Sequence, residues 1–226
     1  DDFRLTCQSG SERQIMFMTD LPDTIALFPL PGAVLFPRSR LPLHIFEPRY
    51  LQMVEDVLKT PTRLIGMIQP VAGDGDRLAA VGSAGRIVAF SEMDDGRLMI
   101  SLRAVSRFRL IEQRPGFSPY LRGAVDWHGY AADLASEPEQ DPALSRGPFM
   151  ARLARYLERN ELSTDWDSAK ASDDETLVNS LAMLLPLAPE EKQALLECAT
   201  LSERRALLEG LLEYALHAGD HEETIQ

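Results

Sequence analysis

The sequence is poor in the features that staple a small fold or anchor it in a membrane. Two cysteines occur among 226 residues, and Cys7 and Cys198 form no paired spacing, which argues against a disulfide framework. No apolar run approaches the ~20 residues that a membrane span needs. The chain begins Asp1-Asp2, without the basic and apolar regions of a signal peptide. We therefore expect a cytoplasmic protein that is held together by its hydrophobic core.

Motifs for nucleotide or nucleophile chemistry are also missing. The phosphate-binding motif G-x-x-x-x-G-K-[ST] does not occur, and the lysines Lys59, Lys170 and Lys192 have no glycine-rich loop beside them. The segment 82–85 (GSAG) lacks the G-x-S-x-G spacing of a nucleophile elbow, and a strand rather than a helix is expected after it. The sequence therefore predicts no ATPase, no peptidase and no other enzyme.

Metal-ligand patterns are incomplete. His217 and His221 are four residues apart, but Gly219 interrupts the helix that would align them, and no third ligand is near in the sequence. The segment 74–76 (DGD) begins like a calcium loop, but Leu78 stands where another oxygen ligand is needed. We expect no metal and no cofactor.

Negative charge predominates, and it is unevenly placed. The formal net charge is −12, of which −1 falls on residues 1–112 and −11 on residues 113–226. Nonspecific nucleic-acid binding depends on neutralising phosphates with Lys and Arg, so this composition argues against nucleic acid as a partner. The acidic second half is better suited to contact with another protein.

The most informative segment is Leu21–Tyr50, in which short apolar stretches are interrupted by prolines. Because proline removes a backbone donor, these stretches are too interrupted for helices, and they favour strands at sheet edges or strand ends. We expect strands at Ile25–Leu30, Ala33–Phe36 and Leu41–Phe46. Pro48 then suits the first position of an amphipathic helix at 49–59.

Further strands are expected up to residue 128. In the arm 97–112, apolar residues alternate with residues that include Arg103, Arg107 and Arg109. The alternation predicts one buried face and one exposed face that carries the arginines. The first part of the chain is therefore expected to be a predominantly antiparallel, barrel-like sheet with one early helix. Its later strands are expected at 62–69, 78–93, 97–112 and 117–128, the second and third of these forming a hairpin.

Beyond residue 128 the hydrophobic period changes to that of helices. Residues 129–148 hold three prolines among acidic and small residues, which is typical of a linker. The pairs Ser172/Glu175 and Thr200/Glu203 have the spacing of a capping box, so helices should begin near them. The expected division is a disordered or added tail at 1–20, a β-barrel at 21–128, a linker at 129–148, a helical part at 149–218 and a tail at 219–226.

Three segments carry a family resemblance: 21–50, the strand pair from 81–87 through 107–110, and 185–212 (LPLAPEEKQALLECATLSERRALLEGLL). Together they resemble the N-terminal domain of Lon protease, the substrate-binding domain that precedes the ATPase, and especially the stand-alone bacterial proteins built from that domain alone. The resemblance implies an α+β fold, with a PUA-like β-barrel followed by a C-terminal α-helical bundle. It also implies polypeptide binding without the ATPase and serine-lysine peptidase of full-length Lon proteases, whose motifs are missing here.

The densest polar cluster of the opening segment is formed by His44, Glu47, Arg49 and Tyr50. One interpretation makes it a recognition site at the rim of the barrel. The alternative is structural: Glu47 caps the helix, Arg49 pairs with a carboxylate, and His44 is a hydrogen-bonded core or rim residue. If the binding role of the family applies, the expected peptide-binding residues are Phe36, His44, Phe46, Arg49, Tyr50 and Arg107.

Three functional hypotheses follow. The first is a non-enzymatic module that binds unfolded or tagged polypeptide, because proline-bounded strands leave backbone groups to which an extended peptide can add a strand. The second is an adaptor that docks on a separate protease or chaperone through its acidic helical part. The third is a small-molecule or RNA-binding module, since the barrel that the resemblance implies is similar to the PUA type known for RNA contacts. The net charge disfavours RNA.

Overall fold

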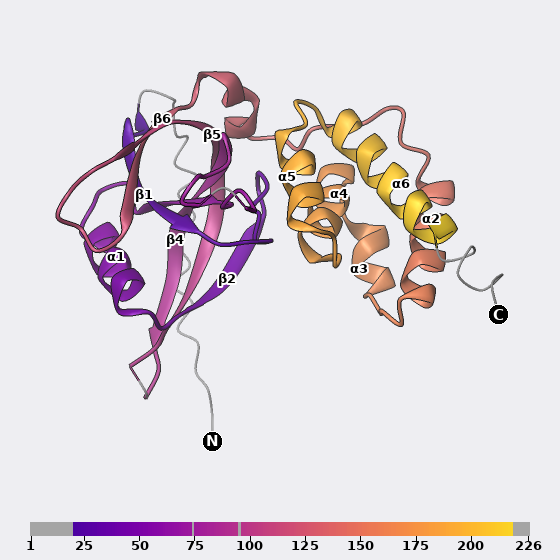
Figure 1. The fold of residues 1–226 in the computed structure, drawn as a ribbon. Helices are drawn as coiled ribbons and strands as arrows, with labels where there is room; N and C mark the ends of the chain where they lie inside the picture. The colour runs from indigo at the N-terminus through magenta and orange to yellow at the C-terminus, as the bar shows by residue number, and fades with distance from the viewer. Residues whose placement is uncertain (1–19, 74, 95, 219–226) are drawn as a thin grey trace.

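A β-rich part and a helical part lie side by side in the structure, a computed structural model (Figure 1). It describes residues 20–73, 75–94 and 96–218, so the expected tails, apart from residue 20, lie outside the described residues. The order of a predominantly antiparallel sheet followed by helices confirms the expected α+β fold.

Five of the six strands close a barrel. β1 pairs with β3 in parallel and with β6 in antiparallel orientation, and β6 also pairs with β5, which completes the ring through β4. Proceeding along the chain, the first part consists of β1 (Thr24–Pro29), β2 (Arg40–Ile45), α1 (Pro48–Leu58), β3 (Leu64–Ile68), β4 (Val81–Glu92), β5 (Leu98–Arg114), β6 (Leu121–Asp126) and the 3-10 helix η2 (His128–Leu134).

Side chains from all five closed strands fill the barrel interior. Members of this buried cluster, in strand order, are Ile25, Leu64, Ala84, Phe108 and Val125. A glycine is required where β4 crosses the largest of them, because a Cβ at Gly82 would lie 2.5 Å from the Cζ of Phe108. Gly82, the first glycine of the GSAG segment, therefore allows close packing inside a strand.

The outer face of the sheet is covered by α1 and by the loop that precedes β2. The helix begins at Pro48, as predicted, and buries Tyr50 and Val54 against the sheet. The predicted strand at Ala33–Phe36 is wrong, because these residues form a loop without strand pairing. Its larger apolar residues are nevertheless buried, since Leu35 packs beside α1 and the following phenylalanine packs against the helical part.

A β-bulge in β5 decides where the arginines of this strand point. Ala104 and Ser106 pair with successive residues of β4, so Val105 between them is an extra residue. An extra residue reverses the alternation of faces along a strand. Arg103 therefore lies on the face that continues the barrel interior, whereas Arg107 points to the outer face and is buried. The expectation of one exposed face that carries all these arginines is wrong.

One end of the sheet continues beyond the closed barrel as a three-stranded ribbon. β2 pairs with Leu98–Arg103 of β5, which pairs on its other side with Arg86–Glu92 of β4. We call these three segments the open ribbon. Among the described strands β2 pairs with β5 alone, so it forms an edge of the sheet. The β4–β5 hairpin carries the ribbon away from the body of the barrel (Figure 1).

The helical part is a bundle around one leucine-rich core, in which Leu153, Leu181, Leu195 and Leu208 are buried. Its amphipathic helices bury their apolar faces against one another and against the barrel, as the helical spacing predicts. The helices are α2 (Arg146–Arg159), α3 (Trp166–Ala171), α4 (Asp174–Leu184), α5 (Pro189–Glu197) and α6 (Leu201–Ala218).

One of the two predicted capping boxes forms. The Thr200 hydroxyl accepts from the Glu203 N–H at 3.2 Å, and the Glu203 carboxylate accepts from the Thr200 N–H at 3.1 Å. The box predicted for Ser172 and Glu175 is wrong, because Asp173 caps α4. Glu175 is instead buried in an ion pair with the first part of the chain.

Two ion pairs join the barrel to the elements that follow it. Arg38, in the loop before β2, pairs with Glu175 of α4 at 2.6 Å, and Arg107 of β5 pairs with Asp133 of η2 at 2.9 Å. The second pair orders the beginning of segment 129–148 against β5. The few apolar residues of this segment led us to expect a linker, and charged side chains supply the contacts that those residues lack.

Candidate polypeptide-binding surface

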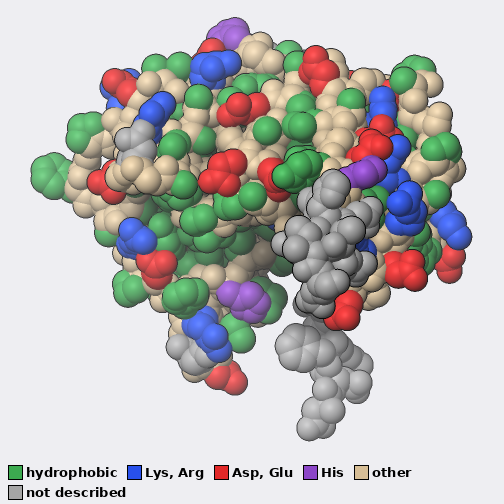
Figure 2. Space-filling view, turned by 45° about the vertical axis from the view of Figure 1, so that its right-hand side comes forward, with side chains coloured by type: hydrophobic (Ala, Val, Ile, Leu, Met, Phe, Trp, Pro, Cys, Tyr) green, Lys and Arg blue, Asp and Glu red, His purple; other side chains and the backbone are tan. Residues whose placement is uncertain are grey.

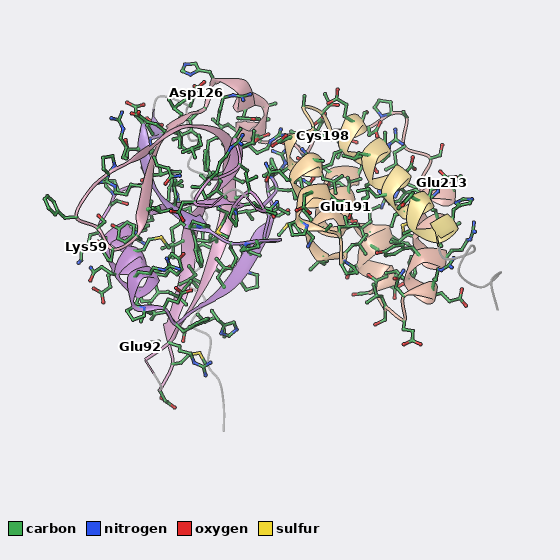
Figure 3. All side chains as sticks on the ribbon, viewed as in Figure 1. Lys59, Glu92, Asp126, Glu191, Cys198 and Glu213 are labelled. Carbon is green, nitrogen blue, oxygen red and sulfur yellow. The ribbon has the colours of Figure 1, made fainter. Side chains whose placement is uncertain are left out.

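Large apolar side chains are exposed on and beside the open ribbon. Phe46 is 64% exposed and Phe90 59%, and they are accompanied by Val88 at 41% and Met99 at 40%. Clustered exposed apolar groups on a folded protein are typical of interaction sites. Figure 2 shows hydrophobic side chains gathered on the surface above the projecting hairpin, and Glu92, labelled in Figure 3, marks the end of β4 there.

The strand register divides these side chains between the two faces of the ribbon. His44 of β2 pairs with Met99 of β5, so the two share the face that continues the barrel interior. Phe46 comes directly after Ile45, the last paired residue of β2. Phe90 pairs with the buried Ile100 and belongs to the opposite face. A polypeptide could therefore contact apolar groups on either side of the ribbon.

The free edge of β2 offers only part of a strand ladder. Pro42 has no N–H, so it fits a position whose N–H would point away from β5. The alternation of an antiparallel pair then points the backbone groups of Arg40 and His44 in the same outward direction. A peptide could add to this edge, but Pro42 removes the central N–H donor. Proline is a common means of limiting the pairing of an edge strand with another chain.

The predicted polar cluster at the start of α1 is partly a structural arrangement. Arg49 forms an exposed ion pair with Glu47 at 2.8 Å and lies 4.5 Å from the ring centre of Tyr50. Tyr50 itself is buried against Phe28, and this burial raises the pKa of its phenol. Glu47 occupies the N-cap position without a side-chain hydrogen bond to the helix. His44 remains exposed on the ribbon.

Two of the expected peptide-binding residues lie in the junction between barrel and bundle. Phe36 is fully buried, with its ring 4.8 Å from the guanidinium carbon of Arg204. Arg107 is 3% exposed, and besides Asp133 it binds the carbonyl oxygen of Cys198, which Figure 3 labels where α5 ends beside the barrel. These side chains hold the two parts together and present no surface to a ligand in this structure.

Sequence reasoning missed Phe90 and Met99. Met99 stands at a position that the alternation of β5 already places on the polar face, so its exposure could have been read from the pattern. Phe90 follows a second bulge at Val88, which nothing in the sequence announces. Of the six expected residues, those whose side chains are exposed are His44, Phe46 and Arg49.

A hollow of about 370 Å³ lies between α1, β1 and β6. Asp56 and Tyr120 face each other in its wall, and the Tyr120 hydroxyl donates to the Asp56 carboxylate at 2.9 Å. Burial raises the pKa of the Tyr120 phenol, and the hydrogen bond to Asp56 raises it further. The phenol therefore stays protonated near neutral pH, and it acts as a hydrogen-bond donor rather than a base.

A second hollow, of about 240 Å³, lies where α5 meets the barrel. Two glutamines cross this junction. Gln69 donates to the carbonyl oxygen of Pro189 at 2.9 Å, and Gln193 donates to the carbonyl oxygen of Val81 at 3.0 Å. The amide groups connect the backbones of the two parts, so this hollow is part of the docking interface between them.

The two side chains considered as nucleophiles, Ser83 and Cys198, occupy structural positions. Ser83 is buried inside β4, where the chain continues as a strand, and burial raises the pKa of the Cys198 thiol, which keeps it protonated. Within residues 20–73, 75–94 and 96–218, no group of three or more His, Cys, Asp and Glu could hold a metal ion. His221 and Asp74, considered above as ligands, lie outside the described residues.

None of the described helices has the length and apolar character needed to cross a membrane.

The structure thus defines a barrel-and-bundle α+β domain with an exposed apolar ribbon. The profile of the ATP-dependent protease La (LON) substrate-binding domain matches residues 24–213, and the chain belongs to this family. The match covers both the barrel and most of the bundle, so what is detected is the substrate-binding domain of Lon and not its ATPase or protease domain.

The curated relatives are much longer than this chain. Lon protease 2 of Myxococcus xanthus is 28% identical over 204 residues, which cover 85% of this chain and 24% of the relative. Lon protease of Desulfosudis oleivorans is 30% identical over 191 residues, which cover 78% of this chain and 22% of the relative. The chain therefore spans about a quarter of the length of these relatives.

Solved structures agree with the family assignment. The crystal structure of a Lon N-terminal domain protein from Xanthomonas campestris aligns with a TM-score of 0.58 and 29% identity, covering 84% of this chain and 98% of that one. The N-terminal domain of the Mycobacterium avium complex Lon protease aligns with a TM-score of 0.62 and 15% identity over the same shares, a likeness that shows the fold. The resemblance inferred from the sequence is confirmed.

Proposed function

We propose that this protein is a non-enzymatic module that holds unfolded or tagged polypeptide on its open ribbon. The observation that carries the proposal is the exposure of Phe46, Met99 and Phe90 beside an unpaired strand edge. The family description, a substrate-binding domain, supports it, because the substrates of a protease are polypeptides.

The ribbon suits binding through apolar side chains better than binding through a long series of backbone hydrogen bonds. Burying one phenylalanine side chain contributes roughly 1.5–3 kcal/mol, so two exposed rings are enough for weak, reversible binding of an apolar segment. Pro42 limits strand addition on β2 to short stretches. Among the residues expected from the sequence, His44, Phe46 and Arg49 are available for direct contact. The ring of Tyr50 packs against the guanidinium group of Arg49.

A reduced and alkylated polypeptide that cannot fold, labelled with a fluorophore, is the probe for this function. We expect fluorescence anisotropy to detect its binding to the full chain, and the double variant Phe46→Ser/Phe90→Ser to bind it at least tenfold more weakly. The control is Phe117→Ser, because Phe117 is a fully exposed aromatic in the β5–β6 loop. Absence of binding by the parent chain, or equal losses in the two variants, would contradict the proposal.

An adaptor role is a second candidate, favoured by the acidity of the helical part and by Leu184 and Tyr214, whose side chains are exposed on α4 and α6. If the bundle docks on a protease or chaperone, the variant Leu184→Ser/Tyr214→Ser should lose that partner in affinity capture from the native cell. The same variant should retain the unfolded polypeptide. Capture that recovers no protease or chaperone with the parent chain would remove this candidate.

A further inference from the structure

Three arginines stand in one row across the open ribbon. Arg40 of β2 pairs with Arg103 of β5, and Arg103 pairs with Arg86 of β4. Arg86 in turn pairs with Leu64 of β3, a residue of the barrel interior. Paired residues project from the same face, so the row lies where the barrel interior opens onto the ribbon.

A fourth arginine adjoins this row. Arg63 precedes Leu64, and its carbonyl oxygen accepts from the N–H of Ile87 at 3.0 Å. Arg86 lies close enough to two of the others to feel their charge: burial lowers the pKa of Arg86, and the charges of Arg103 and Arg63 lower it further.

Three of these four arginines are not neutralised from within the described part of the chain. The guanidinium groups of Arg40, Arg63 and Arg103 are exposed there and form no ion pair. Like charges on neighbouring strands destabilise a sheet, so the stability of the fold does not explain why these arginines lie together. In a protein of net charge −12, such a row is a local concentration of positive charge.

Along the strands, this face changes from basic to apolar. Two residues beyond the arginine row, the small Ser101 of β5 pairs with Pro42. Two residues further on, His44 pairs with Met99, and Phe46 follows. The rise of a strand separates Arg40 from His44 by about 13 Å.

We propose that this face binds extended polypeptide segments in which acidic side chains stand about four residues from apolar ones. The inference rests on the proposed polypeptide-binding function and names its substrate class. In an extended segment, residues i and i+4 project from the same side and are also separated by about 13 Å. Carboxylates would then meet Arg40 and Arg103, with which they form favourable paired hydrogen bonds, while the apolar group contacts Met99 and Phe46.

Nucleic acid fits this face less well than an acidic peptide. A phosphate backbone carries charge along its whole length, whereas the row extends over only about 10 Å, two strand spacings, and the face beyond it is apolar. A peptide places its charges only where the row is and presents apolar groups to the rest of the face.

Matched peptides test the inference on the full chain. The first carries two glutamates four residues from two phenylalanines, the second has glutamine in place of each glutamate, and a short single-stranded RNA serves as competitor. We expect the glutamate peptide to bind about tenfold more tightly than the glutamine peptide, and the difference to shrink when ionic strength rises from about 0.05 to 0.5 M. Arg40→Gln/Arg103→Gln should abolish the difference.

The matched control is Arg109→Gln. Arg109 is an exposed arginine of the same strand, but it follows the bulge and lies on the other face, so this variant should keep the full preference for glutamate. Urea denaturation of each variant checks that the fold is retained.

The outcomes separate this inference from the proposed function. Equal binding of the two peptides, an unchanged preference in Arg40→Gln/Arg103→Gln, or displacement of the glutamate peptide by RNA would each overturn the inference. If the unfolded polypeptide still binds through Phe46 and Phe90 in those cases, the proposed function stands. If neither peptides nor unfolded polypeptide bind, both fall.

Discussion

Arg107 of β5 and Asp133 of η2 form a buried ion pair, with Arg107 Nη2 2.9 Å from Asp133 Oδ1 and Nε 3.0 Å from Oδ2. The same guanidinium donates to the carbonyl oxygens of Leu196 and Cys198, where α5 ends. One side chain of the barrel therefore satisfies the last carbonyls of a helix in the bundle, and Asp133 balances its charge. This relationship fixes the two parts against each other.

Replacing Asp133 should weaken the whole fold. Asp133→Asn leaves the charge of Arg107 buried without its counterion, and removing one partner of a buried pair destabilises by about 3–5 kcal/mol. Urea denaturation followed by circular dichroism measures the free energy of unfolding. The control is Asp126→Asn, because Asp126 pairs with His128 on the surface and should contribute little. Similar losses in the two variants would mean that the junction is not stabilised by this pair.

Glycine at position 82 should be irreplaceable for steric reasons. A Cβ there would lie 2.5 Å from the Cζ of Phe108 and 2.7 Å from the backbone oxygen of Met67, so Gly82→Ala should destabilise by roughly 1–3 kcal/mol. Gly116→Ala serves as control, since nothing lies within 4 Å of a Cβ at Gly116. Thermal unfolding of both variants checks this. A tolerated Gly82→Ala would contradict the close approach of β4 to Phe108.

The capping assignments predict a difference between two similar substitutions. Thr200→Ala removes the hydroxyl that accepts from the Glu203 N–H at the start of α6, and it should destabilise by about 1 kcal/mol. Ser172→Ala should cost less, because Asp173 and not Ser172 caps α4. Denaturant midpoints of the two variants, measured side by side, decide between these assignments, and the reverse order would contradict them.

Asp141 should make the stability of the bundle depend on pH in the acid range. Burial raises the pKa of its carboxyl, but hydrogen bonds from Ser202, Arg205 and the Ala143 N–H outweigh this effect and hold the pKa below its usual value. The folded state thus binds fewer protons at Asp141 than the unfolded state does. The stabilisation is complete above the unfolded pKa of about 3.9 and is lost as the pH falls through the lower folded value.

The corresponding measurement compares the parent chain with Asp141→Asn from pH 7 to pH 2. The variant should be less stable by about 2 kcal/mol at pH 7, and the difference should narrow below about pH 4. Glu55→Gln, on the exposed side of α1, should show little difference across the range. A gap between parent and Asp141→Asn that stays constant down to pH 2 would rule out this role of the carboxylate.

Local patterns predicted much of the secondary structure. Pro48 begins α1 and Thr200 caps α6, because each of these effects depends on backbone groups within one turn of the residue itself. The strand predicted at Ala33–Phe36 is wrong. A strand needs a neighbour to pair with, and the local sequence does not show whether one is present. The capping role predicted for Glu175 is wrong because its carboxylate forms an ion pair with Arg38, which is distant in the sequence.

The candidate site was predictable only in part. The exposure of Met99 follows from the sequence, because the alternation of β5 places it on the polar face. The exposure of Phe46 does not, because Phe46 was expected inside a strand and the pairing of β2 ends at Ile45. The placement of Arg107 does not follow from the sequence either, because one extra residue, Val105, reverses the faces of the side chains that come directly after it in β5. The row of Arg40, Arg103 and Arg86 also depends on register between strands that are far apart in the chain.

By itself, the sequence determined the family, the order of barrel and bundle, and the starts of α1 and α6, since these depend on composition, period and short-range hydrogen bonding. Tertiary structure alone decided which side of the sheet each arginine takes. It buried Phe36 and Arg107 in the junction and left Phe46 and Phe90 exposed. The physical reason is that a bulge, a strand pairing and a buried ion pair each need a partner from a distant segment, and only the folded chain supplies it.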